Sequence, residues 1–454
     1  MQVVVVGGGI AGLAAAHALG GTAGLEVTVL EATDRVGGKL RTSDVEGIAV
    51  DEGAESFLAR VPEALALARA VGLGDDVVNP ASASASLWAR GRLRPIPPRT
   101  VLGVPSSLSS IRGVLSPAEV ARASVDLVLP EHTSRADESV AAAISRRMGP
   151  AVVDRLVEPL LGGVYAGRAD NLSFRATMPQ LAGDDGSLIR AARHALPAES
   201  GPPAPVFATV VGGLGRLAEA TARASGAAIR TGITVRAIRN DGNVFRLVHG
   251  ATNAAEELLA DAIVLAAPPP AAARLLTDIC PAAATELAGI EMASVALVTL
   301  AFRRGDMLPP PGSGYLVPPS AHRPAKGVTI ASAKWAHLDV GDVTIVRCSF
   351  GRYGDTSDLQ RDDADLVDAA VAELRLTGRV AAAPIASRVN RWGGGLPQYS
   401  VGHLDRVRRI RDAIASVPGL AVCGASYEGV GIPACIRTGQ QAADRIKSMA
   451  KGPC

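Results

Sequence analysis

Apolar runs and glycine-rich breaks follow one another at the start of the chain in the order of a strand–helix–strand unit. Val3 to Val6 form a β-branched run that predicts a buried strand. An Ala- and Leu-rich helix should follow, and residues 26–30 predict a second strand that ends at Glu31. This order is typical of a nucleotide-binding βαβ unit.

Glycines occupy the predicted turn between the first strand and the helix. Gly7, Gly9 and Gly12 have the G-x-G-x-x-G spacing. The first permits a tight turn, the second lets a pyrophosphate approach, and the third allows close helix–strand packing. The helix N-terminus attracts phosphates, and Glu31 can accept hydrogen bonds from a ribose. We therefore expect dinucleotide binding, with a merely structural glycine turn as the alternative.

The middle of the chain changes from sheet-like to helical periodicity. Apolar residues recur at three- and four-residue spacing between about 117 and 197, which predicts a mainly helical insertion. A further helix should open near Phe207, and residues 233–250 predict a hairpin with an Asp-Gly turn. Residues 261–268 then predict a buried strand that returns to the nucleotide-binding sheet.

The last third of the chain should contain a second sheet, followed by a glycine-rich region with further helices and a strand. Three β-rich runs between 294 and 351 predict that sheet, and a helix should follow at 362–374. A helix at about 404–416, a strand at 420–424 and a final helix at 434–449 complete the expected elements. The N-terminus of that final helix can present donors to an electron-rich ring edge.

Composition excludes several classes of function. A net charge of +2 and 3% aromatic residues argue against a nucleic-acid partner. Five scattered cysteines lack a CxxC pair, which argues against a disulfide framework or a zinc site and favours a reducing cytosol. No metal is expected. We predict a cytoplasmic protein, since neither a signal peptide nor about 20 continuous apolar residues is present.

One stretch departs from this balance of charge. No acidic residue occurs between Val77 and Ala118, while arginines recur in WARGRLRPIP, which resembles a short hairpin. A solvated surface is the ordinary interpretation of such a run. The alternatives are recruitment of a polyanionic substrate and contact with a membrane surface.

Five motifs carry a family resemblance. GGGIAGL…LEATDRVGGKLRT resembles the FAD-binding opening of the flavin amine oxidase superfamily. DEGAESFLAR, EPLLGGVYAGRADNLS, RWGGGLPQYSVGH and CGASYEGVGIPACIRTGQQAA resemble the oxygen-dependent protoporphyrinogen/coproporphyrinogen oxidases, especially the soluble type of Gram-positive bacteria. This likeness implies an α/β fold in which a Rossmann-type FAD-binding domain (1–78, 205–280 and 388–454) is interleaved with an α+β substrate-binding domain (79–204 and 281–387).

The resemblance also implies site residues. Non-covalent FAD would be held by Gly7, Gly8, Gly9, Ile10, Ala11, Gly12, Glu31, Ala32, Lys39, Gly53, Ala54, Glu55, Ser56, Val235, Trp392, Val430, Gly431 and Ile432. Val235 would meet the adenine through its backbone, and Trp392, which could instead be a core residue, would line the flavin. Substrate would be met by Arg90, Arg92, Arg94, Tyr165 and Gly167.

The implied reaction is oxidation of coproporphyrinogen III to coproporphyrin III in haem biosynthesis. Three hydride transfers to flavin N5 would remove six electrons, with molecular oxygen as acceptor and hydrogen peroxide formed. No general base is assigned, because the pyrrole N–H can release the proton. Some family members have an arginine where this chain reads ASASASLW, so that substrate anchor is not carried over.

Three other functions stay open. Protoporphyrinogen IX is the first alternative substrate. An amine oxidase is the second alternative, although CGASYEGVGIP lacks the Ser-Gly-Gly-Cys-Tyr context of that family's covalent flavin cysteine. A non-catalytic binding protein on the same fold is the third. Peripheral membrane contact and oligomeric state are not decided by the sequence.

Overall fold

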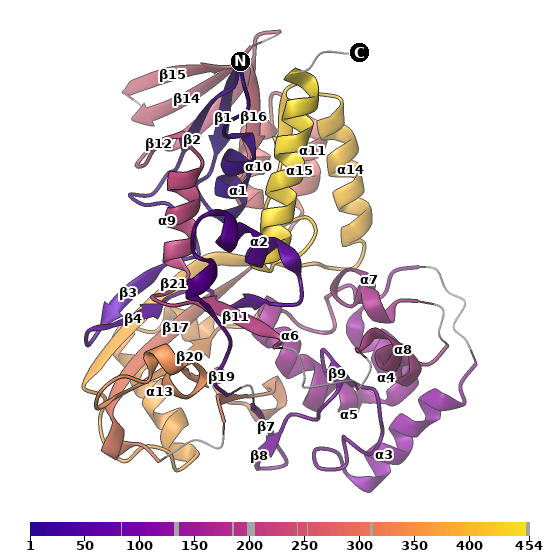
Figure 1. Ribbon diagram of the computed structural model, residues 1–454. Coiled ribbons are helices and arrows are strands. Elements are labelled where there is room, and N and C mark those ends of the chain that lie inside the picture. The colour runs from indigo at the N-terminus through magenta and orange to yellow at the C-terminus, as the bar shows by residue number, and fades with distance from the viewer. Residues whose placement is uncertain are drawn as a thin grey trace.

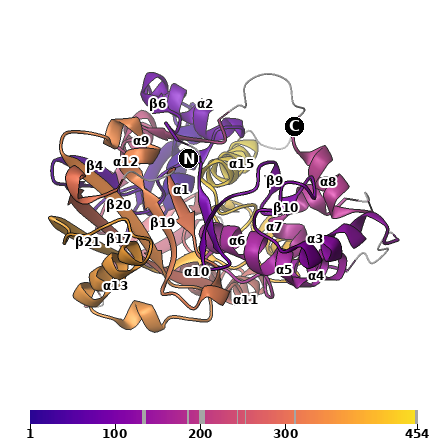
Figure 2. The same cartoon turned by 90° about the horizontal axis from the view of Figure 1, so that it is seen from below.

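A computed structural model describes residues 1–82, 84–130, 136–183, 186–197, 205–242, 244–251, 253–308 and 312–450. The N-terminus and the end of the last described helix, at Ala450, lie at one end of the molecule, beside a parallel sheet and its helices (Figure 1). A second sheet and a helical region occupy the other end, side by side, in both views (Figures 1 and 2). Cys454 lies outside the described residues.

The first sheet has five parallel strands and contains the predicted N-terminal unit. In spatial order they are β12 (Ala228–Arg230), β2 (Glu26–Leu30), β1 (Gln2–Val6), β16 (Ala262–Leu265) and β22 (Leu420–Val422). Val3 pairs with Val27 on one side and Ala262 on the other. The strands predicted at the start of the chain, at 261–268 and at 420–424 are therefore confirmed.

Alternate side chains of β1 enter two different apolar layers, as the period of a strand requires. Val3 and Val5 pack with one layer, and Val4 and Val6 with the other. The first layer contains α1 (Ile10–Leu19), α2 (Pro62–Ala70), α9 (Gly215–Ala224) and α15 (Ile432–Ala450). The second contains β13 (Val235–Asn240), β14 (Phe245–Ala251), β15 (Ala254–Ala260), α10 (Pro269–Leu276), α11 (Pro281–Ala288) and α14 (His403–Ala415).

The second sheet has seven strands, and the predicted arginine hairpin forms one edge of it. In spatial order they are β21 (Ala386–Pro397), β17 (Met292–Arg303), β20 (Val343–Phe350), β19 (Ala325–Ile330), β18 (Gly314–Leu316), β7 (Ser86–Ala89) and β8 (Arg92–Pro95). Arg90 and Gly91 turn the hairpin with φ of 54° and 76°. Helix α13 (Asp363–Leu376) packs on this sheet, and α12 (Ala331–Lys334) links β19 to β20.

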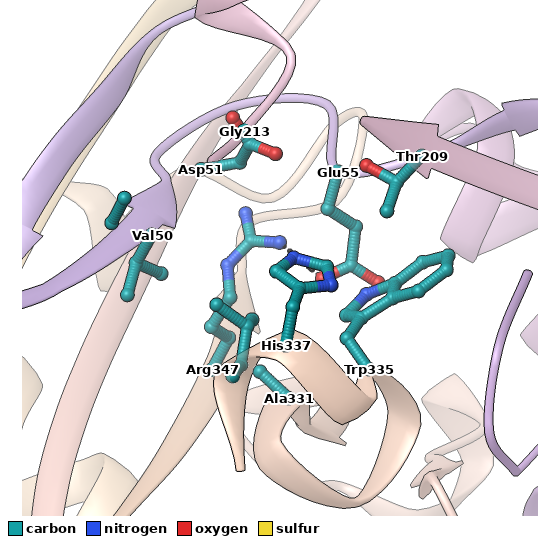
Figure 3. A pocket seen from close by; sticks show the side chains of 11 residues that line it. Val50, Asp51, Glu55, Thr209, Gly213, Ala331, Trp335, His337 and Arg347 are labelled. Atoms are coloured by element: carbon teal, nitrogen blue, oxygen red, sulfur yellow. Dashed lines mark hydrogen bonds and ion pairs between the residues drawn. The ribbon is translucent and has the colours of Figure 1, made fainter. Parts of the chain in front are cut away.

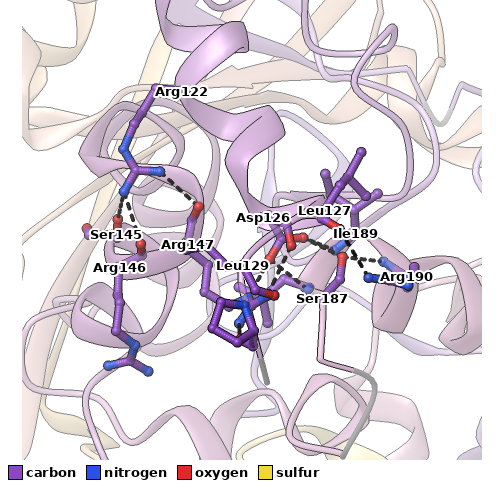
Figure 4. Close-up of polar contacts among 12 residues, drawn as sticks. Arg122, Asp126, Leu127, Leu129, Ser145, Arg146, Arg147, Ser187, Ile189 and Arg190 are labelled. Atoms are coloured by element: carbon purple, nitrogen blue, oxygen red, sulfur yellow. Dashed lines mark hydrogen bonds and ion pairs between the residues drawn. The ribbon is translucent and has the colours of Figure 1, made fainter. Parts of the chain in front are cut away.

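The predicted helical insertion is present and has an apolar core of its own. It comprises α3 (Pro117–Ser124), α4 (Val140–Met148), α5 (Pro150–Val152), a π-helical turn (Val153–Val157), α6 (Glu158–Tyr165), α7 (Phe174–Thr177) and α8 (Leu188–Ala195). Asp126 is fully buried and accepts hydrogen bonds from Arg147 Nε at 2.5 Å, Ser187 Oγ at 2.6 Å and the backbone N–H of Ile189 at 2.9 Å (Figure 4). This carboxylate ties α4 to the start of α8.

Short strands complete the fold. They are the antiparallel pairs β3 (Thr42–Val45) with β4 (Ile48–Asp51) and β9 (Thr100–Val101) with β10 (Val104–Pro105), and the set β5 (Phe57–Leu58), β11 (Phe207–Val210) and β6 (Val77–Val78). The segment after Phe207 therefore begins as a strand, and its helix begins only at Gly215. The pairing partners of β11 lie more than a hundred positions earlier, so local sequence could not reveal them.

The predicted domain boundaries stay a prediction. Near two of the predicted boundaries, at residues 280 and 388, the structure shows with which part of the molecule the neighbouring elements pack. Helix α11, just after residue 280, belongs to the same apolar cluster as α10 and α14. Strand β21, which crosses residue 388, pairs with β17 of the seven-stranded sheet.

Candidate functional site

The glycine turn leaves the first turn of α1 open. Gly7 has a φ of +112°, and a Cβ on Gly12 would collide with the Gly7 carbonyl oxygen. Gly9 precedes the helix without a side-chain cap, and the first helical bond runs from Leu13 N to Gly9 O at 2.9 Å. The N–H groups of Ile10, Ala11 and Gly12 therefore have no acceptor inside the helix. Such an end binds phosphate oxygens well.

Glu31 lies directly beside this turn. Its Oε2 accepts from Gly8 N at 2.7 Å, and its Oε1 accepts from Thr33 N at 2.8 Å. The backbone of Glu31 also accepts from Ile233 N at 2.8 Å, which brings the start of β13 to the same edge. Val235 is buried in the apolar layer there, and Ala32 is exposed. The structure thus brings together the turn, Glu31 and the segment that leads to Val235.

Lys39 lies on the next segment, after Gly37 and Gly38. Its side chain is exposed, yet burial by surrounding protein lowers the pKa of its ammonium. The backbone nearby is fixed by Gly37 N donating to Gly8 O at 2.8 Å and by close approach of Gly53 to the Lys39 carbonyl.

Trp392 packs against the small-residue loop that follows β4. Its Nε1 donates to Glu52 O at 2.8 Å, and its ring carbon Cζ2 lies 3.3 Å from where a Cβ on Gly53 would be. The ring is half-buried and packs against the small apolar cluster of Ala166, Ala293 and Val295. Trp392 therefore forms part of a wall between β21 and the loop of Gly53 and Ala54, rather than a fully enclosed core residue.

Glu55 has two partners that the sequence did not reveal, Lys334 and Arg347. Its carboxylate forms ion pairs with Lys334 and with Arg347, the second of which is visible in Figure 3. Arg347 Nη2 also donates to Gly53 O at 2.8 Å. Burial alone would raise the pKa of Glu55, but the two cations outweigh burial and hold the pKa at about 2. The side chain of Glu55 thus joins the loop to the second sheet. Only the backbone of the loop and half-buried Ser56 remain to face a ligand.

Asp51, four positions earlier, has the opposite electrostatics. It accepts from Thr42 Oγ1 at 2.7 Å and from Leu214 N at 2.9 Å. Burial nevertheless dominates and raises its pKa to about 6. A single short segment therefore carries one strongly acidic carboxyl group and one that titrates near neutral pH.

A second open helix end faces the same region. Val430 and Gly431 precede α15, which begins at Ile432, and the first helical bond runs from Cys435 N to Gly431 O at 3.0 Å. Helix α15 starts in the middle of the molecule and runs toward the C-terminus (Figure 1). It crosses α1 closely, because a Cβ on Gly439 would strike the Ala11 carbonyl oxygen.

Tyr399 connects this turn to the helical insertion, and sequence reasoning did not single it out. Its hydroxyl donates to Ala425 O at 2.5 Å and accepts from Gly429 N at 2.7 Å. Its ring lies 5.6 Å from that of Tyr165, whose pKa burial raises to about 12. Its position in RWGGGLPQY, a motif that already marked the cofactor region, was the one available signal.

The residues predicted to meet substrate do not form one group. Tyr165 is the last residue of α6 and packs in the core of the insertion, and Gly167, two positions later, lies against Gln398. Arg90, Arg92 and Arg94 lie on the β7–β8 hairpin, at the end of the molecule away from β1 (Figure 1). Among the described residues, no hydrogen bond or ion pair joins the two groups.

The assembled features fit a dinucleotide with a flat ring. An open α1 end with the Glu31 carboxylate beside it suits the phosphate and ribose half. A planar, electron-rich group would suit the other part of the site. That part is formed by Gly53, which has no side chain, the ring of Trp392 and the open end of α15. Along the described part of the chain, no helix is long and apolar enough to cross a membrane.

Comparison with known proteins agrees with this geometry. A family model described as flavin containing amine oxidoreductase matches residues 10–447. A coproporphyrinogen III oxidase of Mycobacterium tuberculosis is 38% identical over 439 residues, covering 95% of this chain and 94% of that protein. A coproporphyrinogen III oxidase of Bacillus subtilis is 33% identical, covering 97% of each. A solved structure of a provisional protoporphyrinogen oxidase from Exiguobacterium sp. has a TM-score of 0.86 at 31% identity, covering 99% of both chains. The predicted fold class and the resemblance to porphyrinogen oxidases are confirmed.

Proposed function

We propose that this chain, which belongs to the family of flavin containing amine oxidoreductases, oxidises coproporphyrinogen III to coproporphyrin III in haem biosynthesis. Family membership implies a flavin cofactor, and we propose FAD, with molecular oxygen as the final electron acceptor. The observation that carries this proposal is the likeness to proteins named coproporphyrinogen III oxidase over nearly the whole chain. The meeting of the open α1 end, Glu31 and the Gly53–Trp392 wall supports the cofactor.

The N-terminal unit would hold the AMP and pyrophosphate half. The N–H groups that follow Gly9 would donate to the phosphates, and Lys39 would add positive charge. Glu31 would accept from the ribose hydroxyls, and the backbone at Val235 would meet the adenine. Gly8 N, which now donates to Glu31, would fix the carboxylate for that task.

The C-terminal part of the chain, together with the loop after β4, would hold the flavin ring of the cofactor. Trp392 and the loop from Gly53 to Ser56 would line the flavin, and the open end of α15 at Val430 to Ile432 would stabilise negative charge on it. When bound, the flavin supplies a hydride acceptor at N5 whose electrons pass to oxygen as hydrogen peroxide, and three rounds remove six electrons. No side chain is assigned as a general base.

Non-covalent attachment is supported by the state of the cysteines nearby. Cys423 and Cys435 are buried, and burial raises the pKa of both thiols, that of Cys435 to about 11. A thiol must ionise before it can attack a flavin. Neither side chain is therefore prepared to form a covalent link. We also propose a cytoplasmic location.

An aerobic assay tests the proposal. Purified, FAD-loaded protein is given coproporphyrinogen III or protoporphyrinogen IX, and porphyrin fluorescence is followed. We expect faster appearance of coproporphyrin III. Protoporphyrinogen IX is the second candidate substrate, because the Exiguobacterium neighbour carries that name. Oxidation of protoporphyrinogen IX alone would replace the proposed substrate, and oxidation of neither would refute the function.

A further inference from the structure

A groove runs along the free edge of the seven-stranded sheet, away from the candidate cofactor site. It has a volume of about 330 Å³, within the range of small-molecule sites. Its lining is Arg92, Leu93, Arg94, Pro95, Ile96, Pro97, Pro98, Ser110, Gly113 and Val114. Apolar side chains form most of the wall, and two guanidinium groups border it.

The positive charge beside this groove is not neutralised. Desolvation and then repulsion from Arg92 and Arg90 lower the pKa of Arg94. Within the described residues, none of these three arginines has a carboxylate partner, whereas Arg388 and Arg246 elsewhere in the sheets are paired. Unpaired guanidinium groups that already repel one another favour an anionic ligand.

The arginine side chains are placed for a ligand with two separated charges. Arg92 and Arg94 are two positions apart on β8 and so lie on one face of the strand. Arg94 Nε donates to Ala89 O at 3.2 Å, and its Nη1 donates to Gly113 O, which fixes the guanidinium across the groove. Arg92 is exposed at the rim.

The shape of the groove favours a discrete molecule over a peptide or a membrane. Strand β8 is short and contains Pro95, which has no N–H, so an added peptide strand would find few donors. Among the described residues, the large apolar side chains that are exposed lie outside residues 86–115, so the hairpin has none to insert into lipid. An apolar molecule with two or more carboxylates meets both requirements.

We propose that this groove is a second binding site for a tetrapyrrole tetracarboxylate, separate from the site at the flavin. Arg92 and Arg94 bind two carboxylates at one edge of the macrocycle, and Ile96, Pro97 and Val114 contact its apolar body. The proposal rests on the proposed function for the identity of the ligand. It involves binding alone and no bond is made or broken.

Titration of the FAD-loaded protein with coproporphyrin III tests the groove. Calorimetry and porphyrin fluorescence should give two molecules per chain for the wild type. The Arg92→Ala/Arg94→Ala variant should bind one. Arg223→Ala/Arg408→Ala removes the same charge from two exposed positions elsewhere and should still bind two. Coproporphyrin tetramethyl ester, which lacks the carboxylates, should not occupy the groove.

Arg92→Glu keeps the hydrogen bonds of Arg94 and guards against a folding defect. It should weaken the second site at least about tenfold, the effect of losing one charge-assisted contact. Binding of one porphyrin per wild-type chain, or of two porphyrins by both groove variants, would refute the proposal that the groove is a second binding site. Turnover of coproporphyrinogen III with a single porphyrin site would leave the function standing and refute the groove. Binding of two porphyrins without turnover of coproporphyrinogen III would support the groove and refute the proposed function.

Discussion

The five-stranded sheet reaches the candidate site through glycine backbone, whereas the seven-stranded sheet reaches it through charged side chains. On the first sheet, Gly12 packs against the Gly7 carbonyl and leaves α1 open. On the second, Lys334 and Arg347 hold Glu55 and so fix the loop at Gly53. The backbone region is encoded within thirty residues and the charged junction across nearly three hundred. Substitutions in the glycine backbone should therefore destabilise the protein through steric clashes. Substitutions at the charged junction should destabilise it by leaving buried charges without a partner.

The largest effect is expected at Gly12. Gly12→Ala places a Cβ on the Gly7 carbonyl, so helix and strand must separate, and we expect about 4 kcal/mol or more of lost stability. Gly9→Ala is the matched control, because its Cβ would meet nothing within 4 Å. That variant should keep its unfolding midpoint and lose FAD affinity. Chemical denaturation with flavin titration separates the two, and equal stability of both variants would contradict the backbone account.

The charged junction should be next in size. Glu55→Gln leaves Lys334 and Arg347 buried without their carboxylate, which costs about 3–5 kcal/mol for a buried pair. Glu219→Gln breaks an exposed pair with Arg223 and should cost less than about 1 kcal/mol. Urea unfolding at pH 7 gives both values. A Glu55 variant as stable as the Glu219 variant would show that the ion pairs do not hold the junction.

The two acids of this segment predict opposite pH responses. Asp51 has its folded pKa raised to about 6 from an ordinary 3.8, so its contribution to stability falls as pH rises from 4 to 6. Asp51→Asn should remove that slope, worth up to about 3 kcal/mol. Glu55, held at about 2, contributes stability that is present above 4.5 and lost as pH falls toward 2. Unfolding measured from pH 3 to 8 tests both signs, and an unchanged slope in Asp51→Asn would refute the first.

The smallest effect is expected at Glu31. Glu31→Ala removes the proposed ribose acceptor and the bond from Gly8 N, and should weaken FAD binding about tenfold to a hundredfold. Glu26→Ala, at the start of β2 and exposed, is the control. Flavin release followed by fluorescence measures the affinity. Unchanged FAD affinity in Glu31→Ala would remove the ribose role.

The features that could be predicted from the sequence depend on residues that are close together along the chain. The strand–glycine–helix unit, the β7–β8 hairpin and the helical insertion follow from local periodicity and turn residues. The ion pairs of Glu55 could not be found this way, because Lys334 lies 279 positions away and nothing near Glu55 signals it. Strand β11 was missed for the same reason, and Tyr399 owes its position to the fold around Gly429. Motif likeness, not periodicity, led to Trp392.

The ratio of oxygen consumed to porphyrin formed tests the central claim most directly. An oxygen electrode and porphyrin fluorescence are read together on the FAD-loaded protein with coproporphyrinogen III. Six electrons removed in three rounds predict three molecules of oxygen consumed and three of hydrogen peroxide formed for each coproporphyrin III. Porphyrin formation without oxygen uptake, or no porphyrin above the rate without enzyme, would contradict the account.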